Sequence, residues 1–173
     1  MDVVSRATRS RMMAGIGPRH TKPERVVRHA LTRAGFRYRL HRKDLPGAPD
    51  VVLPGRRLAI FVHGCFWHRH AGCRLAKLPS TNREFWATKL ERNAERDRRA
   101  VEALLSNGWR VLTVWECATR VARDDELGPL LQDLIAGDCR QGELRERLPT
   151  AGPAPEGSCG TRLEVVGGDG EDD

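Results

Sequence analysis

The chain of 173 residues contains no long hydrophobic run. No stretch approaches the ~18 consecutive apolar residues that a transmembrane helix requires, so the sequence predicts no membrane span. Residues 1–6 read Met-Asp-Val-Val-Ser-Arg and are not followed by the apolar region of a secretory signal peptide, so we expect no secretion. No internal repeat is visible, and the length suits one domain with its own core.

The cysteines do not form the pattern of a disulfide framework. There are five, an odd number, and no two of them have Cys-x-x-Cys spacing. In a chain without a secretion signal, such cysteines are more often metal ligands and spare thiols than bridged pairs. Cys139 and Cys159 lie in or near a weakly structured end of the chain, and we interpret them as spare.

Acidic residues are outnumbered by basic ones except at the C-terminal end. Residues 150–173 carry six acidic side chains and one basic one, whereas residues 1–149 carry 29 lysines and arginines against 17 acids. A folded part with a net charge of +12 indicates a polyanionic partner, most often nucleic acid. The alternative is a merely soluble basic surface.

The pattern of apolar residues predicts an α/β domain with a mixed central sheet flanked by helices. Thr21-Lys22-Pro23-Glu24 is a capping box with proline in the first turn, which begins a helix ending near Gly35. Further helices are predicted at 82–107 and about 125–136, and strands at 36–40, 51–53, 58–62 and 109–115. We expect a basic arm at 1–20, the domain at 21–137, and a flexible tail at 138–173 that is acidic at its end.

Residues 61–73 carry most of the chemistry. They read Phe-Val-His-Gly-Cys-Phe-Trp-His-Arg-His-Ala-Gly-Cys and follow an apolar run. Cys65, His70 and Cys73 lie in this loop, and Cys117 lies just past a predicted strand end, where its side chain can meet the loop. Three thiolates and one imidazole would complete a tetrahedral structural zinc site. The alternative is that Cys117 is an ordinary buried thiol.

A second constellation involves Asp50, which follows a proline-containing loop and begins a strand close to the end of the hairpin at His63. A carboxylate, a backbone carbonyl on the partner strand and a phosphate can hold Mg²⁺, and a nearby imidazole can accept a proton from water. Pro-Asp followed by a hairpin is the skeleton of restriction-endonuclease-like nuclease sites. Those sites usually carry Glu-x-Lys on the second strand, where this chain has Phe61-Val62-His63. Taken singly, Asp50 would be a turn residue and His63 a strand-end residue.

Together these motifs resemble the very short patch repair mismatch endonucleases of bacteria over roughly residues 5–135. The motifs are Ala7-Thr8-Arg9-Ser10, Leu45-Pro46-Gly47-x-Pro49-Asp50, Phe61-x-His63-Gly64-Cys65-Phe66-Trp67-His68, Phe85-Trp86, Lys89, Asn93, Glu95-Arg96-Asp97-Arg98-Arg99, Gly108-Trp109-Arg110-Val111-Leu112 and Val114-Trp115-Glu116-Cys117. Such enzymes nick DNA on the 5′ side of the thymine in a T·G mismatch that arises from deaminated 5-methylcytosine.

The resemblance implies a restriction-endonuclease-like core and a role for each site residue. Asp50 and the backbone carbonyl of Val62 would bind catalytic Mg²⁺, and His68 would be the general base, supported by His63 and Glu24. Zinc would be held by Cys65, His70, Cys73 and Cys117. This chain departs from the family pattern at Val62, where the family can carry threonine, and in a loop one residue longer before Cys73.

The DNA-binding residues are expected in three groups. Phe66 and Trp67 are adjacent aromatic residues of the kind that insert between base steps, although one of them could instead pack over the zinc loop. The family-like interpretation places Met13 and Ile16 of the N-terminal arm in the opposite groove. Lys89 and Asn93 share one helix face and could donate to the edges of a wobble pair. Arg92, Arg96 and Arg99 are expected to bind phosphates.

The leading hypothesis is therefore a Mg²⁺-dependent, zinc-stabilised endonuclease that nicks double-stranded DNA at T·G mismatches. We expect a monomer in the bacterial cytoplasm, associated with the nucleoid, with mismatch-repair proteins as further candidate partners. One rival is a zinc-stabilised module that binds mismatched or distorted DNA without cutting it. Another is a zinc hydrolase, which the four predicted ligands disfavour because they leave no open coordination position.

Overall fold

The computed structural model describes residues 20–122, 125–146 and 159–163, the last of these by backbone alone. Its centre is a six-stranded sheet in the order β1-β2-β3-β4-β5-β6. The first two pairings are antiparallel and the other three are parallel, so the sheet is mixed as predicted. The strands are β1 (Arg39–Leu40), β2 (Val51–Leu53), β3 (Leu58–His63), β4 (Arg110–Trp115), β5 (Gln141–Glu146) and β6 (Cys159–Leu163).

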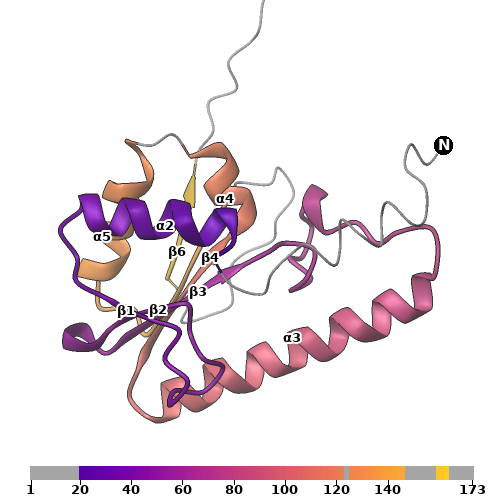
Figure 1. Ribbon diagram of the computed structural model, residues 1–173, viewed down its shortest axis with the longest axis horizontal. Coiled ribbons are helices and arrows are strands. Elements are labelled where there is room, and N and C mark those ends of the chain that lie inside the picture. Colours follow the sequence, from indigo (N-terminus) through magenta and orange to yellow (C-terminus); the bar gives the residue numbers. More distant parts are fainter. Residues whose placement is uncertain (1–19, 123–124, 147–158, 164–173) are drawn as a thin grey trace, which may run out of the picture.

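Helices cover both faces of the sheet (Figure 1). Helices α2, α4 and α5 pack together on one face, and the long helix α3 lies on the other. They comprise α2 (Lys22–Arg33), α3 (Arg83–Ser106), α4 (Glu116–Val121) and α5 (Leu127–Ala136), with short 3₁₀ turns η1 (Pro54–Arg56) and η2 (Arg74–Ala76). None of the described helices is long and apolar enough to cross a membrane.

Strand β3 divides its side chains between the two faces. Leu58, Ile60 and Val62 join the larger core under α2, α4 and α5, whereas Ala59 and Phe61 pack against α3. All six residues of β3 are buried, as expected for a strand covered on both faces. This alternation places His63 on the same face as Phe61, toward α3.

Several sequence expectations hold. Helix α2 begins with the predicted capping box, in which the Thr21 and Glu24 side chains each accept from the other's backbone N–H. The hairpin of β2 and β3 pairs Val51 with Ile60. Helix α3 occupies the predicted segment, but Asn82 before it adopts a left-handed φ of 52° and its side chain makes no capping hydrogen bond.

Other expectations were wrong, and each for a local reason. Of the strand predicted at 36–40, only Arg39–Leu40 pairs with β2. Helix α4 begins directly at Glu116, where only a strand end had been expected. A flexible tail was expected from residue 138 onward, but Gln141–Glu146 forms β5 beside β4. Because Leu144 is the only large apolar residue of β5, hydrophobic patterning could not reveal this strand, which main-chain pairing holds.

Candidate active site

The predicted catalytic residues line one cleft. The cleft has a volume of about 980 Å³ and lies where the start of α2, the loop before β2, the end of β3 and one side of α3 meet. Its titratable lining side chains are Lys22, Glu24, His41, Asp50, His63, His68, Arg96, Asp97 and Glu116. Histidine and carboxylate groups from five segments of the chain therefore face the same space.

Asp50 lies at the mouth of the β2–β3 hairpin and contacts the backbone of Val62. Its Oδ2 accepts a hydrogen bond of 2.8 Å from the Val62 N–H, because the antiparallel register places the residue before Val51 beside the end of β3. Burial raises the pKa of Asp50 to about 6; the hydrogen bond from Val62 opposes this rise and the charge of Glu24 adds to it. A buried carboxylate of this kind is stabilised in its ionised form by a cation.

Glu24 is 3% exposed and belongs to the capping box of α2. Its carboxylate accepts from the backbone N–H groups of His20 and Thr21, at 2.9 and 3.3 Å. The ring of His41 lies between the two carboxylates, with Nε2 3.8 Å from Glu24 and Nδ1 4.0 Å from Asp50. Sequence reasoning missed His41, since it follows a two-residue strand and no local pattern marks it.

His63 and His68 form a stacked pair. Their ring centroids are 3.8 Å apart and their planes differ by 4°. Burial lowers the pKa of His63 to about 3, and the charge of His68 adds to this effect, so His63 is neutral at neutral pH. Nδ1 of His68 lies 2.6 Å from Oδ2 of Asp97.

Asp97 was not among the predicted site residues, although it comes from α3 one turn after Asn93. Because a carboxylate accepts, it fixes the proton of His68 on Nδ1 and leaves Nε2 with a lone pair. An imidazole held in this way is suited to accept a proton. Because α3 carries four other acidic residues, no sequence signal distinguishes Asp97 from them.

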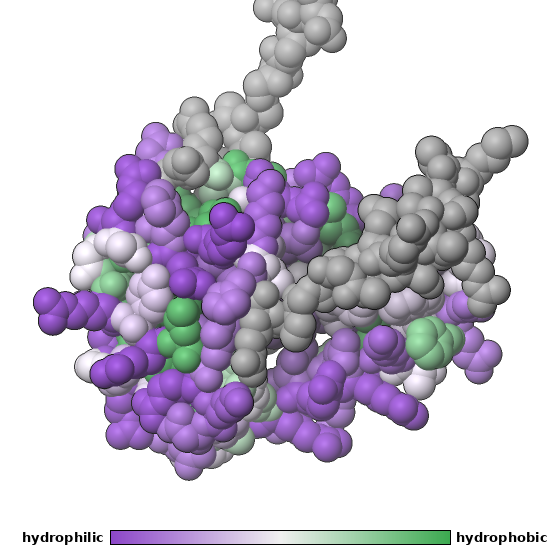
Figure 2. Space-filling view, viewed as in Figure 1, coloured by the Kyte–Doolittle hydropathy of each residue, from purple (hydrophilic) through white to green (hydrophobic). Residues whose placement is uncertain are grey.

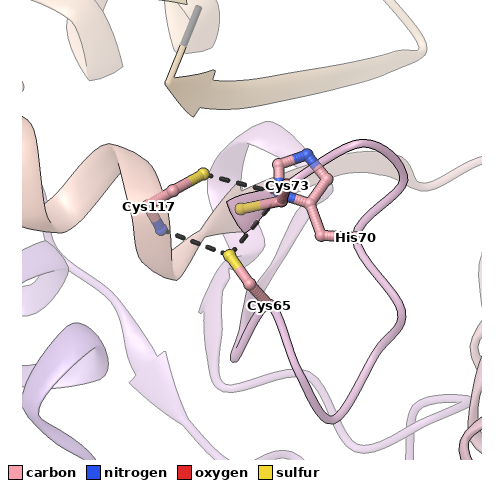
Figure 3. A group of neighbouring side chains, drawn as sticks. All are labelled: Cys65, His70, Cys73 and Cys117. Carbon is pink, nitrogen blue, oxygen red and sulfur yellow. Dashed lines mark hydrogen bonds between the residues drawn. The ribbon is translucent and has the colours of Figure 1, made fainter. Parts of the chain in front are cut away.

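The four predicted zinc ligands converge on one point (Figure 3). Their ligand atoms all lie within 4.8 Å of one another, and all four residues are buried. Nδ1 of His70 is 3.5 Å from Sγ of Cys65 and 3.5 Å from Sγ of Cys117. Cys65, His70 and Cys73 come from the loop after β3, and Cys117 comes from the first turn of α4.

The surroundings of this cluster affect its thiols differently, because burial raises the pKa of Cys73, the hydrogen bond with Cys117 and burial raise that of Cys65, and Cys117 alone has a lowered pKa. Backbone N–H groups of Cys117 and Glu146 point at Sγ of Cys65 and Cys117, both at 3.4 Å. Hydrogen bonds from Cys65 and His70 lower the pKa of Cys117. The His70 ring stacks on Trp115 with 4.1 Å between centroids. Three sulfurs and one nitrogen at these separations fit a four-coordinate metal with bonds of about 2.0–2.3 Å, so the residues present fit a structural metal ion.

An aromatic cluster adjoins the cleft at the N-terminal part of α3. Phe66, Trp67 and Trp86 contact one another edge to face, with centroid distances of 5.2 to 6.0 Å. Helical periodicity predicts Trp86 on the inner stripe of α3, with Leu90 and Leu104, but only those two leucines are fully buried. Phe85 extends the cluster and is 60% exposed.

Lys89 and Asn93 both contact this aromatic cluster. The Lys89 Nζ lies 5.5 to 5.8 Å from the ring centroids of Trp67, Phe85 and Trp86. Nδ2 of Asn93 donates to the backbone carbonyl of Trp67 at 3.1 Å. The residues expected to contact base edges therefore lie beside Phe66 and Trp67, the residues expected to insert between base steps.

The predicted phosphate ligands lie along the outer face of α3. Arg92, Arg96 and Arg99 are exposed and line an open hollow of about 1070 Å³ that also includes Lys89 and Asn93. Hydrophilic side chains gather over this helix in Figure 2. Met13 and Ile16, predicted on the N-terminal arm, lie outside the described residues.

Comparison with known proteins connects this site to one family. Residues 1–74 match the family model of the DNA mismatch endonuclease Vsr. The chain is 45% identical over 146 residues to the DNA mismatch endonuclease Vsr of Escherichia coli strain K12, which covers 83% of this chain and 93% of that protein. It is 50% identical over 116 residues to the type II nicking enzyme V.XorIIP of Xanthomonas oryzae, covering 67% and 85%.

A third relative is the type II nicking enzyme V.NaeI of Lentzea aerocolonigenes, 43% identical over 118 residues, or 64% of this chain and 68% of that protein. The mixed sheet flanked by helices, with Asp50 beside the β2–β3 hairpin, agrees with a restriction-endonuclease-like core. The identity and coverage of these matches lead to one conclusion: the chain belongs to the Vsr family of DNA mismatch endonucleases.

Proposed function

We propose that this endonuclease nicks one strand of double-stranded DNA by hydrolysing the phosphodiester 5′ to the thymine of a T·G mismatch that arises from 5-methylcytosine deamination. The observation that carries the proposal is the placement of Asp50, His63 and His68 in one cleft, beside the aromatic cluster of Phe66, Trp67 and Trp86. Hydrolytic groups and candidate base-stacking groups therefore lie next to each other.

In the proposed mechanism, Asp50 and the main-chain carbonyl of Val62 hold Mg²⁺, which when bound polarises the phosphate and acidifies water. Nε2 of His68 accepts the proton of the attacking water, because Asp97 keeps the other ring nitrogen protonated. Neutral His63 supports His68 from one side by stacking on its ring. Glu24 adds negative charge next to Asp50 and strengthens the attraction for a cation.

Recognition of the mismatch is assigned to groups around the N-terminal part of α3. Phe66 and Trp67 enter the base stack at the mismatch, where unstacking costs least. Lys89 and Asn93 donate to base edges of the wobble pair, and Arg92 and Arg96 bind phosphates. Met13 and Ile16 of the arm act from the opposite groove. Zinc bound by Cys65, His70, Cys73 and Cys117 would fix the conformation of the loop that carries Phe66, Trp67 and His68.

The test compares a T·G duplex with its T·A control in the presence of Mg²⁺. We expect a single nick on the thymine strand of the T·G duplex, and a rate at least about 10²-fold lower in Asp50→Ala and His68→Ala. His29→Ala, on an exposed position of α2, is the matched control. Tight binding of T·G duplex without any nick by the unaltered protein would favour a binding module instead.

A further inference from the structure

A second cluster of metal-binding side chains lies beside Asp50. His20, Glu24 and His41 each offer a ligand atom, and these atoms lie within 4.8 Å of one another. The rings of His20 and His41 meet edge to face with 5.2 Å between their centroids. None of the three belongs to the Cys65–Cys117 cluster, and neither His20 nor His41 has a part in the mechanism proposed above.

The three side chains are positioned independently of any metal. Glu24 is fixed by its bonds to the backbone of His20 and Thr21. His20 and His41 both have left-handed backbone conformations, with φ of 58° and 47°, which histidine adopts more readily than most non-glycine residues. The ligand atoms of both imidazoles lie within 4.8 Å of that of the buried Glu24 carboxylate.

The donor set differs in kind from that proposed around Asp50. Two imidazoles and one carboxylate suit first-row transition ions, whereas an all-oxygen set suits Mg²⁺. The guanidinium of Arg28 lies 3.0 Å from Nδ1 of His20. Since a guanidinium can only donate, Nδ1 of His20 accepts in this pair. A cation that binds to Nδ1 of His20 displaces the guanidinium of Arg28 from this atom.

We propose that His20, Glu24 and His41 form a second divalent-cation site, with a preference for first-row transition ions over Mg²⁺, at the edge of the catalytic cleft. Glu24 and His41 line the same cleft as Asp50, and Nδ1 of His41 lies 4.0 Å from Oδ1 of Asp50. A cation held here adds positive charge next to the expected position of the phosphate. The site requires neither zinc in the cysteine cluster nor the proposed T·G specificity.

The test uses the full-length protein with its structural metal in place, Mn²⁺ as the probe, and excess Mg²⁺ to occupy oxygen-only sites. Pulsed electron paramagnetic resonance detects imidazole nitrogen bound to Mn²⁺, which an all-oxygen site does not produce. We expect nitrogen coupling in the unaltered protein. His20→Gln and His41→Gln should each weaken Mn²⁺ binding at least about tenfold and remove part of the coupling.

His29→Gln is the matched control, because His29 is exposed on α2 outside the cluster, and it should retain both the affinity and the coupling. Structural-metal content and far-ultraviolet circular dichroism check that each variant is folded; His20 is exposed, so its replacement leaves the core intact. Absence of nitrogen-coupled Mn²⁺ in the unaltered protein overturns the site, as does unchanged Mn²⁺ affinity in either ligand variant. Nicking is measured separately, so its loss would count against the proposed function alone.

Discussion

The rings of His63 and His68 lie parallel at 3.8 Å, and only His68 has a carboxylate at its edge, from Asp97 at 2.6 Å. Two histidines that sequence alone treats as similar thus have different environments. His63 is buried and neutral, with its pKa lowered to about 3, whereas His68 is half-buried and oriented. This difference supports the proposal that His68, and not His63, is the general base.

Asp97→Asn should slow nicking of the T·G duplex by about 10²- to 10⁴-fold, because an amide can present its NH₂ to Nδ1 and favour the wrong tautomer of His68. Binding of the same duplex should change little. Single-turnover nicking and equilibrium binding measure the two effects. Asp133→Asn, on an exposed position of α5, is the control, and an Asp97→Asn enzyme with unaltered nicking would exclude the orienting role.

Asp50→Asn should stabilise the fold while abolishing nicking. The folded-state pKa of Asp50 is raised to about 6 from 3.8, so the folded state is penalised once this group ionises. The penalty is absent below about pH 4, grows between about pH 4 and 6 as stability falls with rising pH, and is complete above that range. Removing the charge should raise the free energy of unfolding at pH 7.5 by about 1–3 kcal/mol, as measured by urea unfolding without divalent cations.

Asp44→Asn provides the comparison for this measurement, because Asp44 is exposed and pairs with Arg42, which lowers its pKa. That variant should leave stability at pH 7.5 unchanged or slightly lower. Equal stability of Asp50→Asn and the unaltered protein from pH 4 to 8 would show that burial imposes no cost on the Asp50 carboxylate.

Cys73→Ala should lower the metal content by one zinc ion per chain and destabilise the protein by several kcal/mol, since metal binding free energy is folding free energy. Elemental analysis and thermal unfolding check both outcomes, and a chelator should mimic the variant. Cys139→Ser is the matched control, because Cys139 lies outside the cluster. Full zinc content in Cys73→Ala would refute the ligand set.

Basic residues on α3 should separate into two classes. Arg92→Gln and Arg96→Gln should each weaken binding to the T·G and T·A duplexes equally. Each should also reduce the slope of log affinity against log salt concentration by about one. Lys89→Met should instead reduce the preference for T·G, by about 1–3 kcal/mol. Fluorescence anisotropy over a series of salt concentrations distinguishes these effects, and Arg33→Gln on α2 is the control. If Lys89→Met lost affinity equally for both duplexes, Lys89 would belong among the phosphate contacts.

The parts of the site that sequence could reveal are those with a local pattern. Cys65, His70 and Cys73 lie within nine residues of one another, and Asp50 follows a conspicuous proline loop. His41 and Asp97 carry no such pattern, because each acquires its role only from partners on other elements. Periodicity likewise placed Trp86 in the core, since it could not foresee that Phe66 and Trp67 would cover that side of α3.

The cysteine cluster lies just beyond the last pair of the β3–β4 ladder. His63 pairs with Trp115, and Cys65 and Cys117 each follow two residues later. A shift of one residue between these parallel strands would displace one ligand by about 3.3 Å and turn its side chain toward the other face. A metal bound there would therefore favour the correctly folded chain, because only the correct strand alignment brings all four ligands together.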